Sequence, residues 1–168
     1  ALDNLTASFQ EKSTDEIRTL AKENFRRLGE TYLSILKTGG MEAEAISQIL
    51  KIEGYDQLEK ILKTNPDERI LLAVGHFGNF ELFAWMKLAV PSGQVVTTYR
   101  GLRQRKLTQL MLALRETSGC LYFERRNEGP QLKETIKSPS ILLGLLADQH
   151  AGDGGLRLPV LGREASVS

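Results

Sequence analysis

The spacing of hydrophobic positions changes near residue 66 of this 168-residue chain. Before it, apolar side chains recur every three or four positions, which predicts a long helix over 13–37. Ser13 and Glu16 have the spacing of a capping box at its start, and Gly39-Gly40 follows its end. Its apolar stripe comprises Ile17, Leu20, Ala21, Phe25, Leu28, Tyr32, Leu33 and Leu36. Shorter helices are predicted over 42–51 and 56–63.

After residue 66 the chain alternates between short apolar runs and helical patterns, which predicts an α/β fold with parallel strand pairing. The predicted strands are 69–74, 94–99, 120–124 and 141–147, and the predicted helices are 79–89, 103–118 and 129–137. The helix over 79–89 is apolar on nearly every side, so we expect it to be buried. We therefore expect a single domain over 1–168, in which N-terminal helices (1–66) pack on a mixed or parallel sheet flanked by helices (67–168).

Composition excludes several classes of protein. The 22 basic residues and 21 acidic residues nearly balance, which argues against general nucleic-acid binding. The single cysteine, Cys120, rules out an internal disulfide and is expected to be a small buried hydrophobe. No apolar run approaches the ~20 residues of a transmembrane helix.

The segment Gly75–Glu81 is the strongest candidate for chemistry. It follows an apolar strand, and a helix is predicted to begin inside it, so it lies where open α/β sheets usually carry their sites. His76 could act as a general base, with the Glu81 carboxylate orienting the ring. The alternative is a structural histidine beside a glutamate at a helix start, where the helix dipole favours an acidic residue. A metal site is not expected, since HExxH is absent and no third ligand has helix-face spacing.

The glycine-rich loop 148–155 follows another predicted strand. Asp148 could orient a substrate or pair with a buried arginine. Asp148, His150 and Asp153 could instead hold a metal, although such residues in a glycine-rich loop more often form a turn.

Residues 100–126 form a basic run with seven basic side chains and only two acidic ones. Such a face could bind an acidic protein, an anionic headgroup or phosphates, or it could be an ordinary solvated surface. Arg115 differs from the others, because it lies one turn before Gly119 near the end of a predicted helix and could point into a site.

The segment His76-Phe77-Gly78-Asn79-Phe80-Glu81 is similar to the H-x4-D/E signature of glycerolipid-type acyltransferases. With the rest of the chain it resembles the late acyltransferases of lipid A biosynthesis, and their relatives that acylate phosphatidylinositol mannosides. The further matching segments are, in order, Asn4-Leu5, Phe9 to Ser13, Gly29-Glu30, Gly54-Tyr55, Tyr99-Arg100, Arg115, Gly119, Asp148-Gln149 and Pro159 to Gly162.

The resemblance implies transfer of a fatty acyl group from acyl carrier protein or coenzyme A to a glycolipid hydroxyl, with no metal and no cofactor beyond that acyl donor. It implies that His76 deprotonates the hydroxyl and that Glu81 supports it. Arg115 would bind phosphate or developing negative charge, with Asp148 orienting it. The substrate-binding positions it implies are Arg115, Asp148, Asn79, Gly78, Arg100 and Gln149.

The implied partners are an acidic acyl carrier protein bound through residues 100–126, a glycolipid acceptor and the cytoplasmic face of the inner membrane. A phosphatidylinositol mannoside or aminolipid acceptor is an alternative, and a non-catalytic carrier- or lipid-binding module is an alternative of another class. Departures from the family are Gln10, Leu161 and Ala165 to Ser168. Because the family's anchoring helix and its later residues are not in this chain, we expect an incomplete domain.

Overall fold

The computed structural model describes residues 1–167 and has an α/β architecture, which confirms the predicted fold class. The chain divides into two compact units. One comprises Ala1–Ile35, Gly75–Phe80 and Leu146–Ser168, and the other comprises Leu36–Val74 and Glu81–Leu145. The expected single domain with a boundary near residue 66 stays a prediction.

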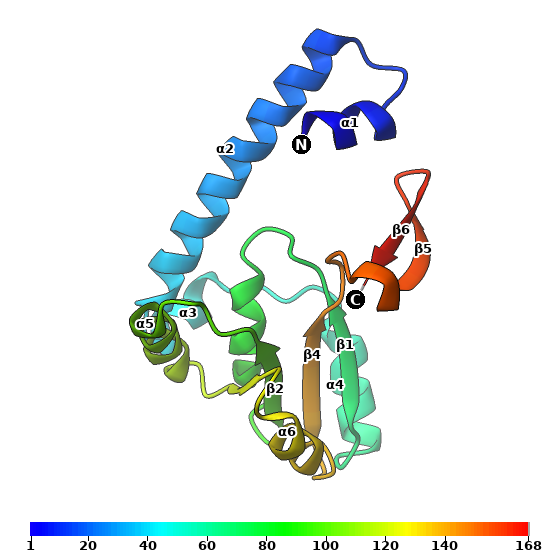
Figure 1. Cartoon of the computed structure of the whole chain (residues 1–168). Helices are drawn as coiled ribbons and strands as arrows, with labels where there is room; N and C mark the ends of the chain where they lie inside the picture. The colour runs from blue at the N-terminus through cyan, green and yellow to red at the C-terminus, as the bar shows by residue number, and fades with distance from the viewer. Residues whose placement is uncertain (168) are drawn as a thin grey trace. The chain divides into compact units, whose positions relative to one another are not determined.

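The second unit is organised around a four-stranded sheet (Figure 1). Its strands are β1 (Ile70–Val74), β2 (Gln94–Tyr99), β3 (Leu121–Glu124) and β4 (Ile141–Leu146), in the order β1-β4-β2-β3. All four run parallel, with Val96 of β2 opposite Leu121 of β3 on one side and Leu143 of β4 on the other. Each strand begins and ends within one residue of its predicted bounds, because short apolar runs between turn signals define strands well.

The helices of this unit also lie close to their predicted positions. They are α3 (Ala43–Ile49), α4 (Tyr55–Thr64), α5 (Arg105–Glu116) and α6 (Gly129–Thr135). The segment predicted as a helix over 79–89 is a 3₁₀ helix, η1 (Phe80–Leu88), which is long for this type. Its burial is less complete than expected, since Ala84 and Trp85 are buried but Leu88 is 41% exposed.

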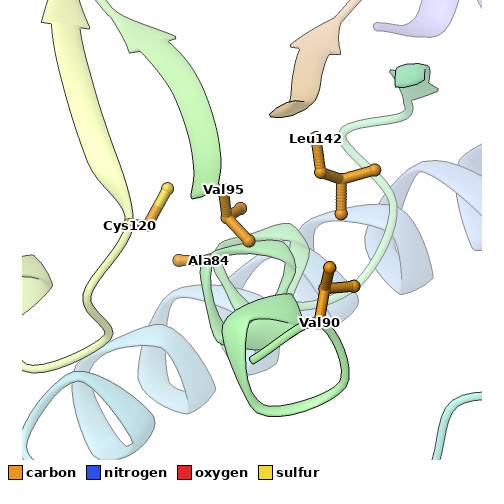
Figure 2. Packing of buried hydrophobic residues seen from close by; sticks show 5 residues of the cluster. All are labelled: Ala84, Val90, Val95, Cys120 and Leu142. Carbon is orange, nitrogen blue, oxygen red and sulfur yellow. The ribbon is translucent and has the colours of Figure 1, made fainter. Parts of the chain in front are cut away.

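The core of the second unit lies where η1 packs against the sheet. Figure 2 shows its buried side chains, Ala84, Val90, Val95, Cys120 and Leu142. Leu58 and Leu62 of α4 pack against this cluster. The predicted burial of Cys120 is confirmed, at 7% exposure. Burial raises the pKa of its thiol to about 12, so the thiol stays protonated at neutral pH.

The first unit contains α1 (Leu2–Ser8) and most of α2 (Thr14–Gly39), the predicted long helix. Its capping box is confirmed, because the Ser13 backbone N–H donates to Glu16 Oε2 at 2.8 Å and the Glu16 N–H donates to Ser13 Oγ at 3.4 Å. These hydrogen bonds lower the pKa of Glu16. Within the described part of the chain, no helix combines the length and apolar character needed to cross a bilayer.

The apolar stripe of α2 is buried only near its N-terminal end. Ile17 and Ala21 are buried. Phe25, Leu28, Tyr32, Leu33 and Leu36 are between 44% and 69% exposed. Helical periodicity therefore predicted the helix correctly, but not the extent of its burial.

A β-hairpin in the first unit was not predicted. It consists of β5 (Leu156–Val160) and β6 (Arg163–Val167), which pair antiparallel after the 3₁₀ turn η2 (Gly152–Gly154). Leu161 and Gly162 form its two-residue turn, with φ of 48° and 75°. The alternation of Leu156, Leu158 and Val160 before a glycine was the signal that could have identified it.

Gly144→Ala should destabilise the protein, because a Cβ at this position would overlap the ring of Phe83 in the packed core. We expect a loss of about 1–3 kcal/mol in the free energy of unfolding, measured by denaturant titration. Gly29→Ala is the control, since no atom lies within 4 Å of its added methyl group on α2. This control should gain roughly 0.5–1 kcal/mol, and equal behaviour of the two variants would refute the packing argument.

Candidate active site

The turn between β1 and η1 carries His76, and the loop after β4 carries Asp148. Each residue follows the end of its strand by two positions, and β1 and β4 are neighbours in the sheet. Gly78 continues the first turn with φ of 55°, a left-handed conformation that glycine adopts without strain. Since parallel strands end at the same edge, this topology brings two residues far apart in sequence into contact.

Asp148 holds His76 with both of its carboxylate oxygens. Oδ1 lies 2.6 Å from His76 Nδ1, and Oδ2 accepts the backbone N–H of His76 at 2.7 Å. A methyl group at Gly75 would lie 3.4 Å from Oδ2, so the carboxylate passes close to the backbone there. One side chain thus fixes both the ring and the backbone of His76.

The hydrogen bonds to Asp148 also determine which ring nitrogen of His76 can accept a proton. Burial raises the pKa of Asp148, but the hydrogen bonds from the His76 ring and backbone outweigh it, so the pKa lies below its ordinary value. The carboxylate is therefore ionised at neutral pH and can only accept hydrogen bonds. A neutral His76 must carry its proton on Nδ1, which leaves Nε2 as a proton acceptor.

The two phenylalanines of this turn have different environments. The Phe80 ring packs edge-on against His76, with ring centroids 4.9 Å apart and an interplanar angle of 64°. Phe77, next to His76 in the chain, is 94% exposed. The His76 side chain keeps 25% of its exposure, so the ring is held but accessible.

In the second unit, Glu81 and Arg115 form an ion pair. Arg115 Nε donates to Glu81 Oε2 at 3.0 Å, and an Nη group of Arg115 donates to Oε1, which makes the pair bidentate. Both side chains are mostly buried, at 17% exposure for Glu81 and 16% for Arg115. Burial lowers the pKa of Arg115, but the hydrogen bond and charge of Glu81 outweigh it and leave the pKa raised.

Two tyrosines lie against the Arg115 guanidinium. Its Cζ is 5.0 Å from the ring centroid of Tyr122 and 6.0 Å from that of Tyr99. Both distances are within the range of cation–π attraction. Burial raises the pKa of both phenols. Tyr122 was not predicted as a site residue, and its place in the apolar strand was the only signal available.

The hydrogen bonds require a correction to the expected pairing. Sequence spacing suggested that Glu81 orients His76, and the family resemblance implied that Asp148 orients Arg115. In the structure, the carboxylate bonded to His76 belongs to Asp148, and the carboxylate bonded to Arg115 belongs to Glu81. Spacing along the chain favoured the nearer acid, whereas the hydrogen bond that forms spans 72 residues.

The other predicted site residues are divided between the two units. Asn79 is in the His76 turn, Arg100 is exposed directly after β2, and Gln149 is exposed directly after Asp148. The loop beyond Gln149 forms η2 and a bridge between His150 and Val167. Among residues 1–167, no group of three or more His, Cys, Asp or Glu side chains is arranged to hold a metal ion.

Residues 1–168 match the family described as bacterial lipid A biosynthesis acyltransferase. The chain belongs to this family. The resemblance carried by the His76 segment is thereby confirmed, and the protein is an acyltransferase. No curated protein matches the chain.

The ion pair of this acyltransferase can be tested apart from its activity. Glu81→Gln and Arg115→Met each leave one partner without its counter-charge in a largely buried site. We expect each to lower the free energy of unfolding by roughly 3 kcal/mol, the lower end for a buried pair, because both side chains keep some exposure.

The double variant Glu81→Gln/Arg115→Met removes both charges and should lose less than the two single variants combined. Denaturant unfolding of all three variants measures this difference. Additive losses, or single losses below about 0.5 kcal/mol, would show that the pair does not stabilise the protein as a unit.

Proposed function

We propose that this acyltransferase moves a fatty acyl group from the thioester of acyl carrier protein or coenzyme A to a hydroxyl of a lipid A precursor. His76 is the general base of this proposal, and Asp148 is the residue that positions it. The observation that carries it is the hydrogen bond between His76 Nδ1 and Asp148 Oδ1, which leaves Nε2 as the proton acceptor.

In the proposed reaction, Nε2 takes the proton of the acceptor hydroxyl while the oxygen attacks the thioester carbonyl carbon. The C–S bond then breaks, an ester forms, and the proton on His76 passes to the departing thiolate. The negative charge of Asp148 stabilises the imidazolium that forms in between. No acyl-enzyme is required, and the protonated thiol of Cys120 is not a nucleophile in this scheme.

Glu81 and Arg115 have a supporting role in this proposal. Two of the Arg115 N–H groups already bond to Glu81, and its charge is balanced by that carboxylate. A paired guanidinium is a weaker anion site than a free one, so the geometry favours a role in holding η1 to α5. Phosphate binding by Arg115 stays a prediction.

Within the basic run, the start of α5 is the surface that we propose for binding the acyl carrier protein. Arg115 is engaged with Glu81, whereas Arg103, Arg105 and Lys106 are exposed at the start of α5. An open groove of about 520 Å³ is lined there by Gln104, Arg105, Lys106, Leu107 and Leu110. Basic side chains beside exposed leucines suit an acidic protein with apolar contacts.

Action at the cytoplasmic face of the inner membrane is part of this proposal.

His76→Ala should abolish acyl transfer, and Asp148→Asn should lower kcat by about 10²-fold or more, because the ring loses its partner and its preferred tautomer. The measurement is transfer from acyl-acyl carrier protein to a lipid A precursor in detergent, with the full-length enzyme. His150→Ala is the control and should retain activity. Turnover by the His76→Ala variant would refute the assignment of His76 as the base. Transfer only to mannosylated lipids would show that the acceptor is a phosphatidylinositol mannoside and not a lipid A precursor.

Arg105→Glu/Lys106→Glu should raise KM for acyl-acyl carrier protein by about tenfold, since two favourable charges become repulsive. An acyl-pantetheine donor, which has no acidic protein, should show unchanged kcat/KM. Lys60→Glu/Lys133→Glu makes the same change in net charge on α4 and α6 and should leave both donors unaffected. Equal KM values for the two charge-reversed proteins would rule out carrier binding at α5.

A further inference from the structure

Three exposed arginines, Arg100, Arg125 and Arg126, follow the ends of two adjacent strands of the sheet. Tyr99 at the end of β2 lies opposite Glu124 at the end of β3. The ladder continues one residue further, since the Arg125 N–H donates to the Tyr99 carbonyl at 3.0 Å. Arg100 and Arg125 therefore leave the sheet side by side, separated by about 4.8 Å, the spacing of neighbouring strands.

Glu124 holds these two strand ends together. Its Oε2 accepts the backbone N–H groups of Arg126 at 2.7 Å and Asn127 at 3.0 Å, and its Oε1 accepts the N–H of Gly101 at 3.3 Å. Burial raises the pKa of Glu124, but these hydrogen bonds and the charge of Arg126 outweigh it, so the pKa lies below its ordinary value. The charged carboxylate therefore fixes the backbone on both sides of the arginine cluster.

The arginines of this cluster are not neutralised by ion pairs. Within residues 1–167, none of Arg100, Arg125 and Arg126 forms a salt bridge. The two acidic residues of the β3 turn are bonded to the backbone, since Glu124 accepts three N–H groups and Glu128 accepts the Glu124 N–H. Three guanidinium groups carried by a fixed backbone form an anion site, and their planar N–H forks match the oxygens of a phosphate.

The loop after Arg100 leads directly to the surface proposed for the acyl carrier protein. The Leu102 N–H donates to Thr108 Oγ1 at 2.9 Å, so this loop is bonded to the first turn of α5. Arg105 and Lys106 follow in that turn. Both proposed donors, acyl carrier protein and coenzyme A, hold the acyl thioester on a pantetheine arm, and the far end of this arm carries a phosphate.

We propose that Arg100, Arg125 and Arg126 bind the phosphate at the far end of the donor's pantetheine arm. This inference rests on the proposed function, since it requires a pantetheine thioester as the donor. All four strands of the sheet end at this edge, and β2 is next to β4 and two strands from β1. Two strand spacings are about 10 Å, which an extended pantetheine arm exceeds. The cluster recognises the arm that both donors share, whereas α5 recognises the carrier protein.

The test compares two donors that differ only in the phosphate, dodecanoyl-4′-phosphopantetheine and dodecanoyl-pantetheine, with the full-length enzyme in detergent and a lipid A precursor as acceptor. The native enzyme should show about tenfold higher kcat/KM for the phosphorylated donor, because charge-assisted hydrogen bonds hold its phosphate. Arg100→Gln/Arg125→Gln/Arg126→Gln should reduce this advantage to less than about twofold and leave the value for dodecanoyl-pantetheine unchanged.

Lys60→Gln/Arg69→Gln/Lys133→Gln is the matched control, because it removes three exposed positive charges elsewhere in the second unit. It should keep the full preference for the phosphorylated donor. Equal use of the two donors by the native enzyme would overturn the proposal, and so would an equal loss for both donors in the Arg100/Arg125/Arg126 variant. A rise in KM for the acceptor alone would also overturn it, because the cluster would then bind a phosphate of the glycolipid.

A second measurement needs no turnover. The phosphorus NMR line of 4′-phosphopantetheine should broaden on addition of the native enzyme or the control variant, and should stay narrow with the Arg100/Arg125/Arg126 variant. Broadening by an enzyme that transfers no acyl group would support the phosphate site while the proposed reaction fails. The same line width with all three proteins would refute the site.

Discussion

The two hydrogen bonds from His76 to Asp148 are the interaction on which the arrangement of this site depends. An imidazole on a turn can rotate and can carry its proton on either nitrogen. The Asp148 carboxylate removes both freedoms, because one oxygen holds Nδ1 and the other holds the backbone N–H of the same residue. The carboxylate is stabilised in its charged form by the bonds it makes, since they lower its pKa. The same hydrogen bonds therefore hold the ring and the turn in place and keep Asp148 in its charged form.

The Glu81–Arg115 pair satisfies a second constraint, the presence of a charge in a mostly buried environment. A guanidinium at 16% exposure needs a partner, and Glu81 provides a bidentate one while Tyr122 and Tyr99 cover the cation. The pair links the first turn of η1 to the end of α5. The glutamate of the H-x4-E segment is thus accounted for by a structural contact in the second unit.

Much of the fold could be predicted from the sequence. Strand periods, helix caps and turn residues are local signals, and they identified the four sheet strands and the start of α2. The hairpin formed by β5 and β6 was missed because its alternating apolar positions lie in a glycine-rich part of the sequence, where such a signal is weak. The exposure of Phe25 and Leu33 on α2 was also missed, because periodicity shows which face is apolar and not whether another element covers it.

The sequence by itself determined the family, the α/β class and the candidate residues. His76 and Asp148 follow strands, Glu81 lies at a helix start, and Arg115 lies near a helix end. Only the tertiary structure decided which carboxylate bonds to His76 and which bonds to Arg115. His76 meets Asp148 across 72 residues, and Arg115 meets Glu81 across 34. The first pairing depends on strand order within the sheet, since β1 lies beside β4, and the second joins η1 to α5. The reason is physical: hydrogen bonds form between groups that are close in space, and distance along the chain does not determine that closeness.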